Sequence, residues 1–159
     1  MRKGHADRVA EAIGTGLYSG YFPLFPGTVG SLAGIAIYLV LRGLSLISES
    51  HWLGWPVLLA ITFVAGWWSA GRCETLFGHD ARRIVVDEIL GMFLTLFLLP
   101  ASWGWILGGF ILFRFFDVIK PFPARRVEAV GGGLGVMLDD AFAGIYANAV
   151  LHLIRALLG

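Results

Sequence analysis

Carboxylates are the side chains of this sequence whose types and spacing are best suited to chemistry. They occur as Asp80, Asp87 and Glu88 near the start of one apolar segment, Asp117 near the end of the next, and Asp139 with Asp140 early in the last. These six are more than half of the 11 acidic residues. An ionised carboxylate is costly to remove from water unless it is paired or bound to a metal. Acids in apolar sequence are therefore candidates for a functional site.

Carboxylate oxygens from separate helices predict a site for Mg²⁺, a hard ion that prefers oxygen ligands and keeps several waters. We expect the ligands to be Asp87, Glu88, Asp117, Asp139 and Asp140. Adjacent residues on a helix are about 100° apart. In each adjacent pair, one carboxylate would then bind directly while the other binds through water or acts as a base. The alternative is ion pairing with nearby bases, namely Arg82, Arg83, Arg114, Lys120, Arg125 and Arg126. For any single acid, ion pairing explains its presence as well as a metal does. For the full set of acids, we favour the metal site.

A run of small and hydroxyl residues, Phe25 to Ser31, precedes or begins the first long apolar segment. A glycine-rich helix start presents free N–H groups to an anion, and Gly27, Thr28 and Ser31 are the candidate phosphate ligands. The alternative is an N-cap with small residues that allow close helix packing. Three bases, Arg82, Lys120 and Arg125, are candidates to balance the charge of a phosphate. Lys120 could instead pair with Asp117, because residues three apart share a helical face.

The composition predicts an all-α, multi-pass helical membrane protein formed by a single domain over residues 1–159. Hydrophobic residues are 57% of the chain and charged residues 14%, against about 25% charged in soluble domains. Five apolar segments are expected, at residues 30–46, 56–71, 84–99, 103–119 and 134–158. Several are marginal for a span of about 20 residues, so a half-inserted segment would change their count. Residues 7–17 predict an N-terminal amphipathic helix on the surface, with Val9, Ala10, Ile13 and Leu17 on its apolar face.

The basic residues predict the orientation. They gather before the first apolar segment, between the second and third, and between the fourth and fifth, whereas the loops at 47–55 and 100–102 contain no Lys or Arg. Because cytoplasmic loops carry the excess of basic residues, the N-terminus and the acidic cluster are expected at the cytoplasmic face. Trp52, Trp55 and Trp103 flank the other loops, as interfacial aromatics do.

Other classes of site are disfavoured. No dense basic stripe with interleaved aromatics is present, so nucleic acid is not an expected partner. The single cysteine, Cys73, excludes an internal disulfide and a multi-cysteine metal site. The expected partners are the membrane and a phospholipid substrate within it, and the sequence leaves a homo-oligomer open.

Several stretches, in matching order, resemble the phosphatidylglycerophosphatase A family. They are Pro26 to Ser31, His79-Asp80 with Ile84 to Glu88 and Gly91-Met92, Phe113-Arg114 with Asp117 and Lys120-Pro121, and Gly132 to Asp140 with Ala143-Gly144. The likeness extends from about residue 14 to 148. It implies an all-helical fold, a bacterial inner-membrane location, Mg²⁺ dependence and conversion of phosphatidylglycerophosphate to phosphatidylglycerol.

The expected reaction is phosphomonoester hydrolysis by water, with catalytic roles for Asp80, Asp87, Glu88 and Asp117. Glu88 or Asp80 would take the proton. An aspartyl-phosphate intermediate ranks lower, because the chain has no Asp-x-Asp pair. One rival function is a headgroup phosphoalcohol transferase, whose later pair of aspartates four apart is missing. Another is an ion or proton transporter, which predicts acids distributed through the membrane depth. A small assembly subunit would not need matched acids on three helices.

Overall fold

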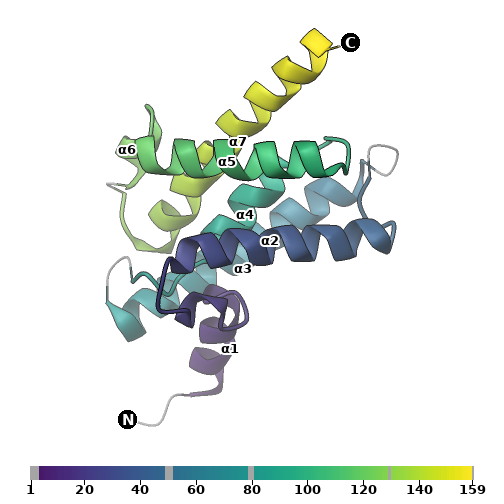
Figure 1. Cartoon of the computed structure of the whole chain (residues 1–159). Coiled ribbons are helices and arrows are strands. Elements are labelled where there is room, and N and C mark those ends of the chain that lie inside the picture. Colours follow the sequence, from purple (N-terminus) through teal and green to yellow (C-terminus); the bar gives the residue numbers. More distant parts are fainter. Residues whose placement is uncertain (1–3, 49–51, 79–80, 129, 159) are drawn as a thin grey trace.

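The structure is a computed structural model that describes residues 4–48, 52–78, 81–128 and 130–158, and within these ranges all regular structure is helical (Figure 1). The helices are α1 (His5–Gly14), the 3₁₀ turn η1 (Ser19–Tyr21), α2 (Pro26–Gly43), α3 (Gly54–Phe77), α4 (Val86–Thr95), α5 (Trp103–Ile119), α6 (Ala124–Glu128) and α7 (Gly132–Leu158). The prediction of an all-α fold is confirmed.

Three helices, α2, α3 and α7, are long and apolar enough to cross a membrane. α5 is apolar but has 17 residues, about 26 Å at 1.5 Å each, slightly less than the hydrocarbon core of about 30 Å. The side chains of these helices that face away from the protein are large and apolar, such as Ile61, Val64 and Leu107. The prediction of a multi-pass helical membrane protein is confirmed.

The third apolar segment is not a continuous spanning helix, unlike the expectation for residues 84–99. Its helix, α4, has only 10 residues, about 15 Å, and it packs against α2, α3, α5 and α7. Most of its residues are buried, including Leu90, Met92 and Phe93. Beyond Thr95 the chain turns, with Leu98 in the left-handed region at φ 54°. α4 is thus a half-length helix enclosed by the other four.

Because α4 stops at Thr95, the backbone carbonyls at its C-terminal end have no helical partners. Side chains of α7 donate to these carbonyls instead. Asn148 Nδ2 donates to the carbonyls of Thr95 at 3.0 Å and Phe97 at 2.9 Å. A ring nitrogen of His152 lies 3.1 Å from the Phe97 carbonyl, and Arg155 Nη1 donates to that of Leu98 at 3.1 Å. Unpaired carbonyls are costly at membrane depth. These α7 side chains therefore allow α4 to end where it does.

Glycines bring the helices around α4 into close contact. A Cβ on Gly144 of α7 would lie 2.5 Å from the Gly91 carbonyl oxygen, and one on Gly91 would lie 2.3 Å from the Phe113 ring. At the start of α7, a Cβ on Gly133 would lie 2.4 Å from the Gly71 nitrogen of α3. Helices of membrane proteins use small residues in this way for close approach.

The N-terminal amphipathic helix is present as α1, but its bounds and buried face differ from the prediction. It ends at Gly14 with Thr15 as its C-cap, so Leu17 lies beyond the helix, adopts a left-handed φ of 53° and is exposed. Its buried residues are Ala10, Glu11 and Gly14. They pack on α3, where Cys73 Sγ donates to the Ala10 carbonyl at 3.4 Å. α1 therefore packs on the helical body through Ala10, Glu11 and Gly14.

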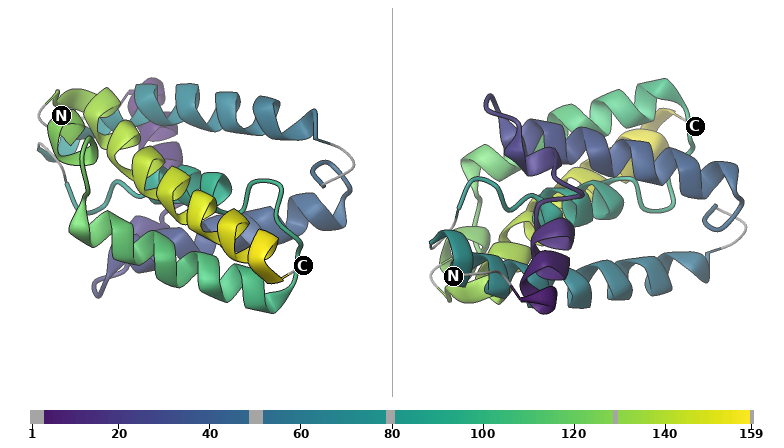
Figure 2. Two further views of the ribbon diagram at one scale, coloured as in Figure 1. Left: turned by 90° about the horizontal axis from the view of Figure 1, so that it is seen from above. Right: turned by 90° about the horizontal axis from the view of Figure 1, so that it is seen from below.

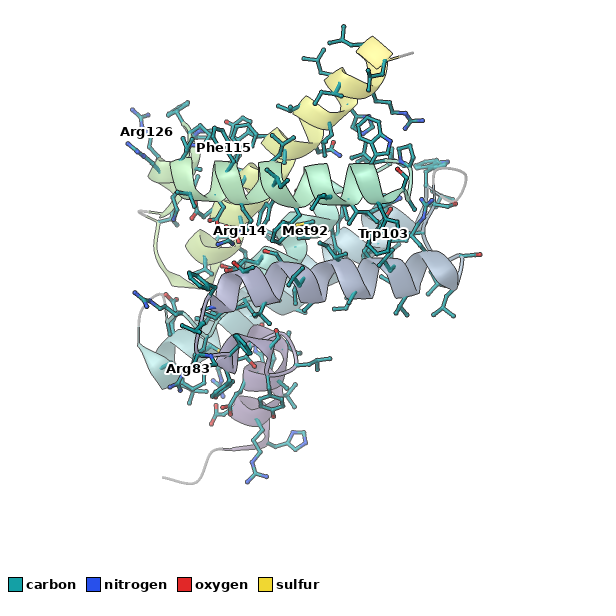
Figure 3. All side chains as sticks on the ribbon, viewed as in Figure 1. Arg83, Met92, Trp103, Arg114, Phe115 and Arg126 are labelled. Atoms are coloured by element: carbon teal, nitrogen blue, oxygen red, sulfur yellow. The ribbon has the colours of Figure 1, made fainter. Side chains whose placement is uncertain are left out.

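α3 and α5 run in the direction opposite to α2, α4 and α7 (Figure 2). α2, α4 and α7 begin at the end of the molecule where α3 and α5 finish, and we name this the polar end. Figure 3 shows Arg83 and Arg126 at this end and Trp103 at the opposite one. Trp55 was expected at the interface, but it is fully buried and packs edge-on against Phe97, with ring centroids 5.3 Å apart. That expectation is wrong, since the indole belongs to the core.

We predict that Asn148→Leu, which keeps the side-chain size but removes the donor, will destabilise the protein by about 1–3 kcal/mol. The physical reason is that the carbonyls of Thr95 and Phe97 lose a common donor. Thermal unfolding in detergent measures the effect. Leu153→Ala on the same helix is the control, because Leu153 is exposed. Equal melting temperatures for the two variants would contradict the role given to Asn148.

Candidate active site

A pocket of about 750 Å³ opens at the polar end. Its walls come from the loop before α2, the first turn of α2, the segment 81–84, and the polar-end turns of α4, α5 and α7. Five acidic and four basic side chains line it: Asp87, Glu88, Asp117, Asp139, Asp140, Arg82, Arg83, Arg114 and Lys120. The described acids predicted from the sequence therefore share a single cavity.

Three of these carboxylates meet without a neutralising base. Asp87 and Glu88 belong to the first turn of α4 and Asp140 to α7. One oxygen from each lies within 4.8 Å of the other two. No ion pair from a described residue reaches them, and the buried atoms Asp87 Oδ1 and Glu88 Oε2 accept no hydrogen bond there. Three such groups repel one another strongly unless a cation or protons lie between them.

The other two carboxylates are paired with bases. Arg114 Nη1 lies 2.9 Å from Asp117 Oδ2, and Lys120 Nζ lies 2.5 Å from Asp139 Oδ2. Oxygens of Asp117 and Asp139 also lie within 4.8 Å of Asp140. Asp140 therefore belongs to both acidic groups and stands at the centre of the cluster.

Lys120 does not form the helical pair with Asp117 that its spacing suggested. It is the residue that ends α5, and its φ of 48° takes the chain out of the helix. Its ammonium therefore reaches across to Asp139 of α7, and Asp117 pairs with Arg114 one turn earlier on its own helix.

The first turn of α2 forms part of the pocket wall through Pro26, Gly27 and Thr28. The N–H groups of a first turn have no helical partners, so those of Gly27 and Thr28 remain available to an anion. A Cβ on Gly27 would lie 2.4 Å from Glu88 Oε1 and 3.3 Å from Arg114 Nη1. A side chain here would displace the Glu88 carboxylate, so glycine allows both charged groups to lie against the backbone as they do.

The remaining predicted residues are placed as follows. Arg82 lines the pocket. Ser31 does not, because it is fully buried and its hydroxyl donates to the Gly27 carbonyl at 2.9 Å. Arg125 is exposed on α6 and is not part of the wall. Asp80 lies outside the described residues.

Two parts of the site were not predicted from the sequence. Arg114 was named as a base that could neutralise an acid and as part of a stretch resembling the family, but it was not named as a site residue, although an arginine in an apolar helix is itself a signal of function. Figure 3 shows it between α5 and α2, whereas its neighbour Phe115 lies on the outer side of α5. The loop at 20–24 is the second part, and its apolar sequence gave no sign that it lines a charged pocket.

The fold and the site define a helical membrane protein with a carboxylate-lined pocket at one end. A family model for phosphatidylglycerophosphatase A matches residues 12–155. The chain belongs to this family, and it is accordingly a phosphoric monoester hydrolase.

Curated relatives cover most of the chain. A protein of Haemophilus influenzae named phosphatidylglycerophosphatase A is 40% identical over 146 residues, which are 90% of this chain and 86% of the relative. The protein of that name from Escherichia coli is 34% identical over 89% of this chain and 81% of its own length. A Bacteroides thetaiotaomicron protein, provisionally named as a phosphatidylinositol-3-phosphatase, is 38% identical over 92% and 94%. No solved structure matches the chain.

We predict that Gly27→Ala will lower phosphatase activity by roughly 10- to 100-fold, since displacing reacting groups by about 1 Å can cost 100-fold. The added Cβ forces Glu88 or Arg114 away from α2. The measurement is phosphate release by purified protein. Gly104→Ala is the matched control, because a Cβ there meets nothing within 4 Å. Wild-type activity of the Gly27 variant would show that this contact has no part in catalysis.

Proposed function

We propose that the protein hydrolyses the terminal phosphate of phosphatidylglycerophosphate to give phosphatidylglycerol, with Mg²⁺ as its cofactor. The observation that carries this proposal is the convergence of Asp87, Glu88 and Asp140 within 4.8 Å, without ion pairs from the described residues, in a pocket that also holds basic side chains. The substrate is the one named for two of the relatives.

The donor set fits a divalent cation. Asp87, Glu88 and Asp140 would hold one ion, and Asp117, Asp139 and Asp140 offer a second position that shares Asp140. All donors are carboxylate oxygens, the ligands that Mg²⁺ prefers. Two buried oxygens, Asp87 Oδ1 and Glu88 Oε2, lack a hydrogen-bond donor among the described residues and so have free coordinating capacity. Bound Mg²⁺ supplies Lewis-acid stabilisation of phosphoryl oxygens and increases the acidity of water.

Other residues of the pocket bind the phosphate and transfer the proton. Arg82 neutralises the phosphate, and Arg114 and Lys120 add positive charge to the same pocket although they are paired with Asp117 and Asp139. The N–H groups of Gly27 and Thr28 donate to the phosphate oxygens. Of the adjacent pair Asp87 and Glu88, Asp87 would bind the ion directly, and Glu88, bound through water, would accept the proton of the attacking water. The water oxygen forms a bond to phosphorus as the bond to the glycerol oxygen breaks. That oxygen leaves as an alcohol after it takes from Glu88 the proton of the water, and inorganic phosphate is released.

The transporter hypothesis receives less support from the placement of the acids. The described carboxylates of the cluster all lie in the polar-end turns of α4, α5 and α7. A proton relay requires titratable groups in succession through the membrane depth. Farther along α7, the polar side chains Asn148, His152 and Arg155 are engaged with backbone carbonyls.

The direct test measures phosphate release from phosphatidylglycerophosphate and from phosphatidylinositol 3-phosphate by purified protein, with and without Mg²⁺. We expect Mg²⁺-dependent turnover, with phosphatidylglycerophosphate preferred. Asp87→Asn and Asp140→Asn should lower it by on the order of 100-fold or more. They should also remove the rise in melting temperature that Mg²⁺ gives the wild type, because a ligand of the folded state stabilises it.

Glu74→Gln is the control, since Glu74 lies on α3 outside the pocket. Full turnover in chelator would refute the cofactor. A clear preference for the phosphoinositide would refute the substrate but leave the phosphatase chemistry intact.

We further propose that the polar end faces the cytoplasm of a bacterial inner membrane. Arg72, Arg82, Arg83, Lys120, Arg125 and Arg126 belong to segments at this end, and cytoplasmic loops carry such excess. This orientation is compatible with a homo-oligomer, in which each copy would present its pocket to the same side of the membrane.

Cysteine labelling tests the orientation in intact spheroplasts. We expect a membrane-impermeant thiol reagent to label Ser102→Cys, at the opposite end, directly, and Arg126→Cys only after permeabilisation. Both positions are exposed, whereas the native Cys73 is buried and serves as background. The reverse pattern would place the pocket outside.

A further inference from the structure

The loop that precedes α2 carries large apolar side chains outward at the polar end. We name residues 17–25 the aromatic lip. Six of its side chains are between 39% and 76% exposed: Leu17, Tyr18, Tyr21, Phe22, Leu24 and Phe25. Exposed apolar residues are expected along spanning helices, but this segment is a loop with a single 3₁₀ turn. Its residues 20–25 also line the charged pocket. The lip therefore needs an explanation other than the lipid-facing side of a helix.

The lip is held in place by the protein rather than being loosely exposed. The Gly20 nitrogen donates to the Thr15 carbonyl at 3.0 Å, and a Cβ on Gly20 would lie 2.1 Å from the Arg83 carbonyl oxygen. Leu17, Tyr18 and Phe25 all adopt positive φ values, between 53° and 69°. Non-glycine residues take this conformation at an energetic cost. The fold maintains the apolar side chains on the outside despite that cost.

Contacts at the base of the lip are typical of the membrane–water interface. The Arg83 guanidinium lies 5.0 Å from the centroid of the Tyr21 ring and 5.7 Å from that of Phe77. The Tyr21 hydroxyl donates to Glu11. Partial burial, and then the hydrogen bond to Glu11, raise the pKa of the Tyr21 phenol. Tyrosine and arginine with an apolar body and a polar tip are enriched at headgroup depth.

The pocket therefore has two chemically different sides. The polar-end turns of α4, α5 and α7 contribute the charged groups, and the lip contributes Phe22, Leu24 and Phe25. In Figure 2 the loop before α2 projects beyond the end of that helix and away from the helical body. A molecule that matches both sides has a phosphate at one end and an apolar part beside it.

We propose that the aromatic lip inserts into the interfacial layer of the bilayer and receives the glycerol backbone and first acyl carbons of the phospholipid substrate, so that the substrate enters the pocket from the membrane. This inference rests on the proposed function and specifies how that substrate is recognised. The partner of the lip is a lipid surface. The lip adjoins the charged site on one side and the exposed apolar side chains of α2 on the other, so it connects the bilayer with the pocket.

The activity test compares two substrates on protein in nanodiscs: long-chain phosphatidylglycerophosphate in the bilayer and its dihexanoyl analogue dissolved in water. The variant is Phe22→Ser with Leu24→Ser, and the readout is the ratio of long-chain to short-chain turnover. We expect this ratio to fall by about 10-fold or more, because two buried apolar contacts with lipid are removed. An unchanged ratio would overturn the proposal.

Leu44→Ser is the matched control, since Leu44 is 64% exposed and Leu24 is 65% exposed, but Leu44 follows the opposite end of α2. The control should keep the wild-type ratio. A comparable fall in this variant would trace the effect to general loss of lipid contact and overturn a specific role for the lip.

A second measurement does not depend on turnover and separates this inference from the proposed function. A fluorophore on Leu24→Cys should be quenched by lipids that carry a nitroxide near the headgroup, and more strongly than one on Arg126→Cys at the same end. Equal quenching would refute insertion of the lip. Quenching in a protein that hydrolyses neither lipid would refute the proposed function and retain the lip as a membrane contact.

Discussion

The mutual repulsion of Asp87, Glu88 and Asp140 is the constraint on which the rest of this structure depends. Three carboxylate oxygens within 4.8 Å, two of the acids being adjacent in sequence, are unfavourable in a partly dehydrated pocket. The chain nevertheless uses its helices to hold them together. α4 contributes its first turn, where the positive end of the helix dipole stabilises negative charge. Because Gly27 has no side chain, the Glu88 carboxylate can lie against α2. The neighbouring acids Asp117 and Asp139 are neutralised by Arg114 and Lys120.

The half-length helix α4 explains how such a cluster can be built at the surface of a membrane protein. A full spanning helix would need about 20 residues with little freedom in its position. α4 is instead enclosed by α2, α3, α5 and α7, and its backbone is completed by donors from α7. Its position is therefore set by protein contacts. Gly91 and Gly144 remove the side chains that would otherwise keep α4 and α7 apart.

The sequence was sufficient to predict the helical class, the ends of α5 and α7 and the grouping of acids at one end, because hydropathy and the placement of charges carry that information. The predicted bounds of α2 and α3 differ from the observed ones by up to six residues. The sequence could not show that α4 stops at Thr95, since the donors that permit this, Asn148 and His152, are more than 50 positions away in the chain. It also left the partners of Lys120 open. A left-handed φ at that residue decides them, and no local pattern signals it. Similarly, the Ser31 hydroxyl is consumed by its own helix.

A single helix, α7, lies against α4 at both of its ends. Asp140 faces the first turn of α4, while Asn148, eight residues later and about 12 Å along the axis, holds the carbonyls at its last turn. The spacing of Asp140 and Asn148 along α7 thus matches the length of α4. When a bilayer thins or thickens, spanning helices adapt by tilting, and α4 must move with α7 as one unit. The distance between Asp140 and the carboxylates of α4 is therefore set by contacts between these two helices, and it does not depend on how far either helix tilts in the bilayer.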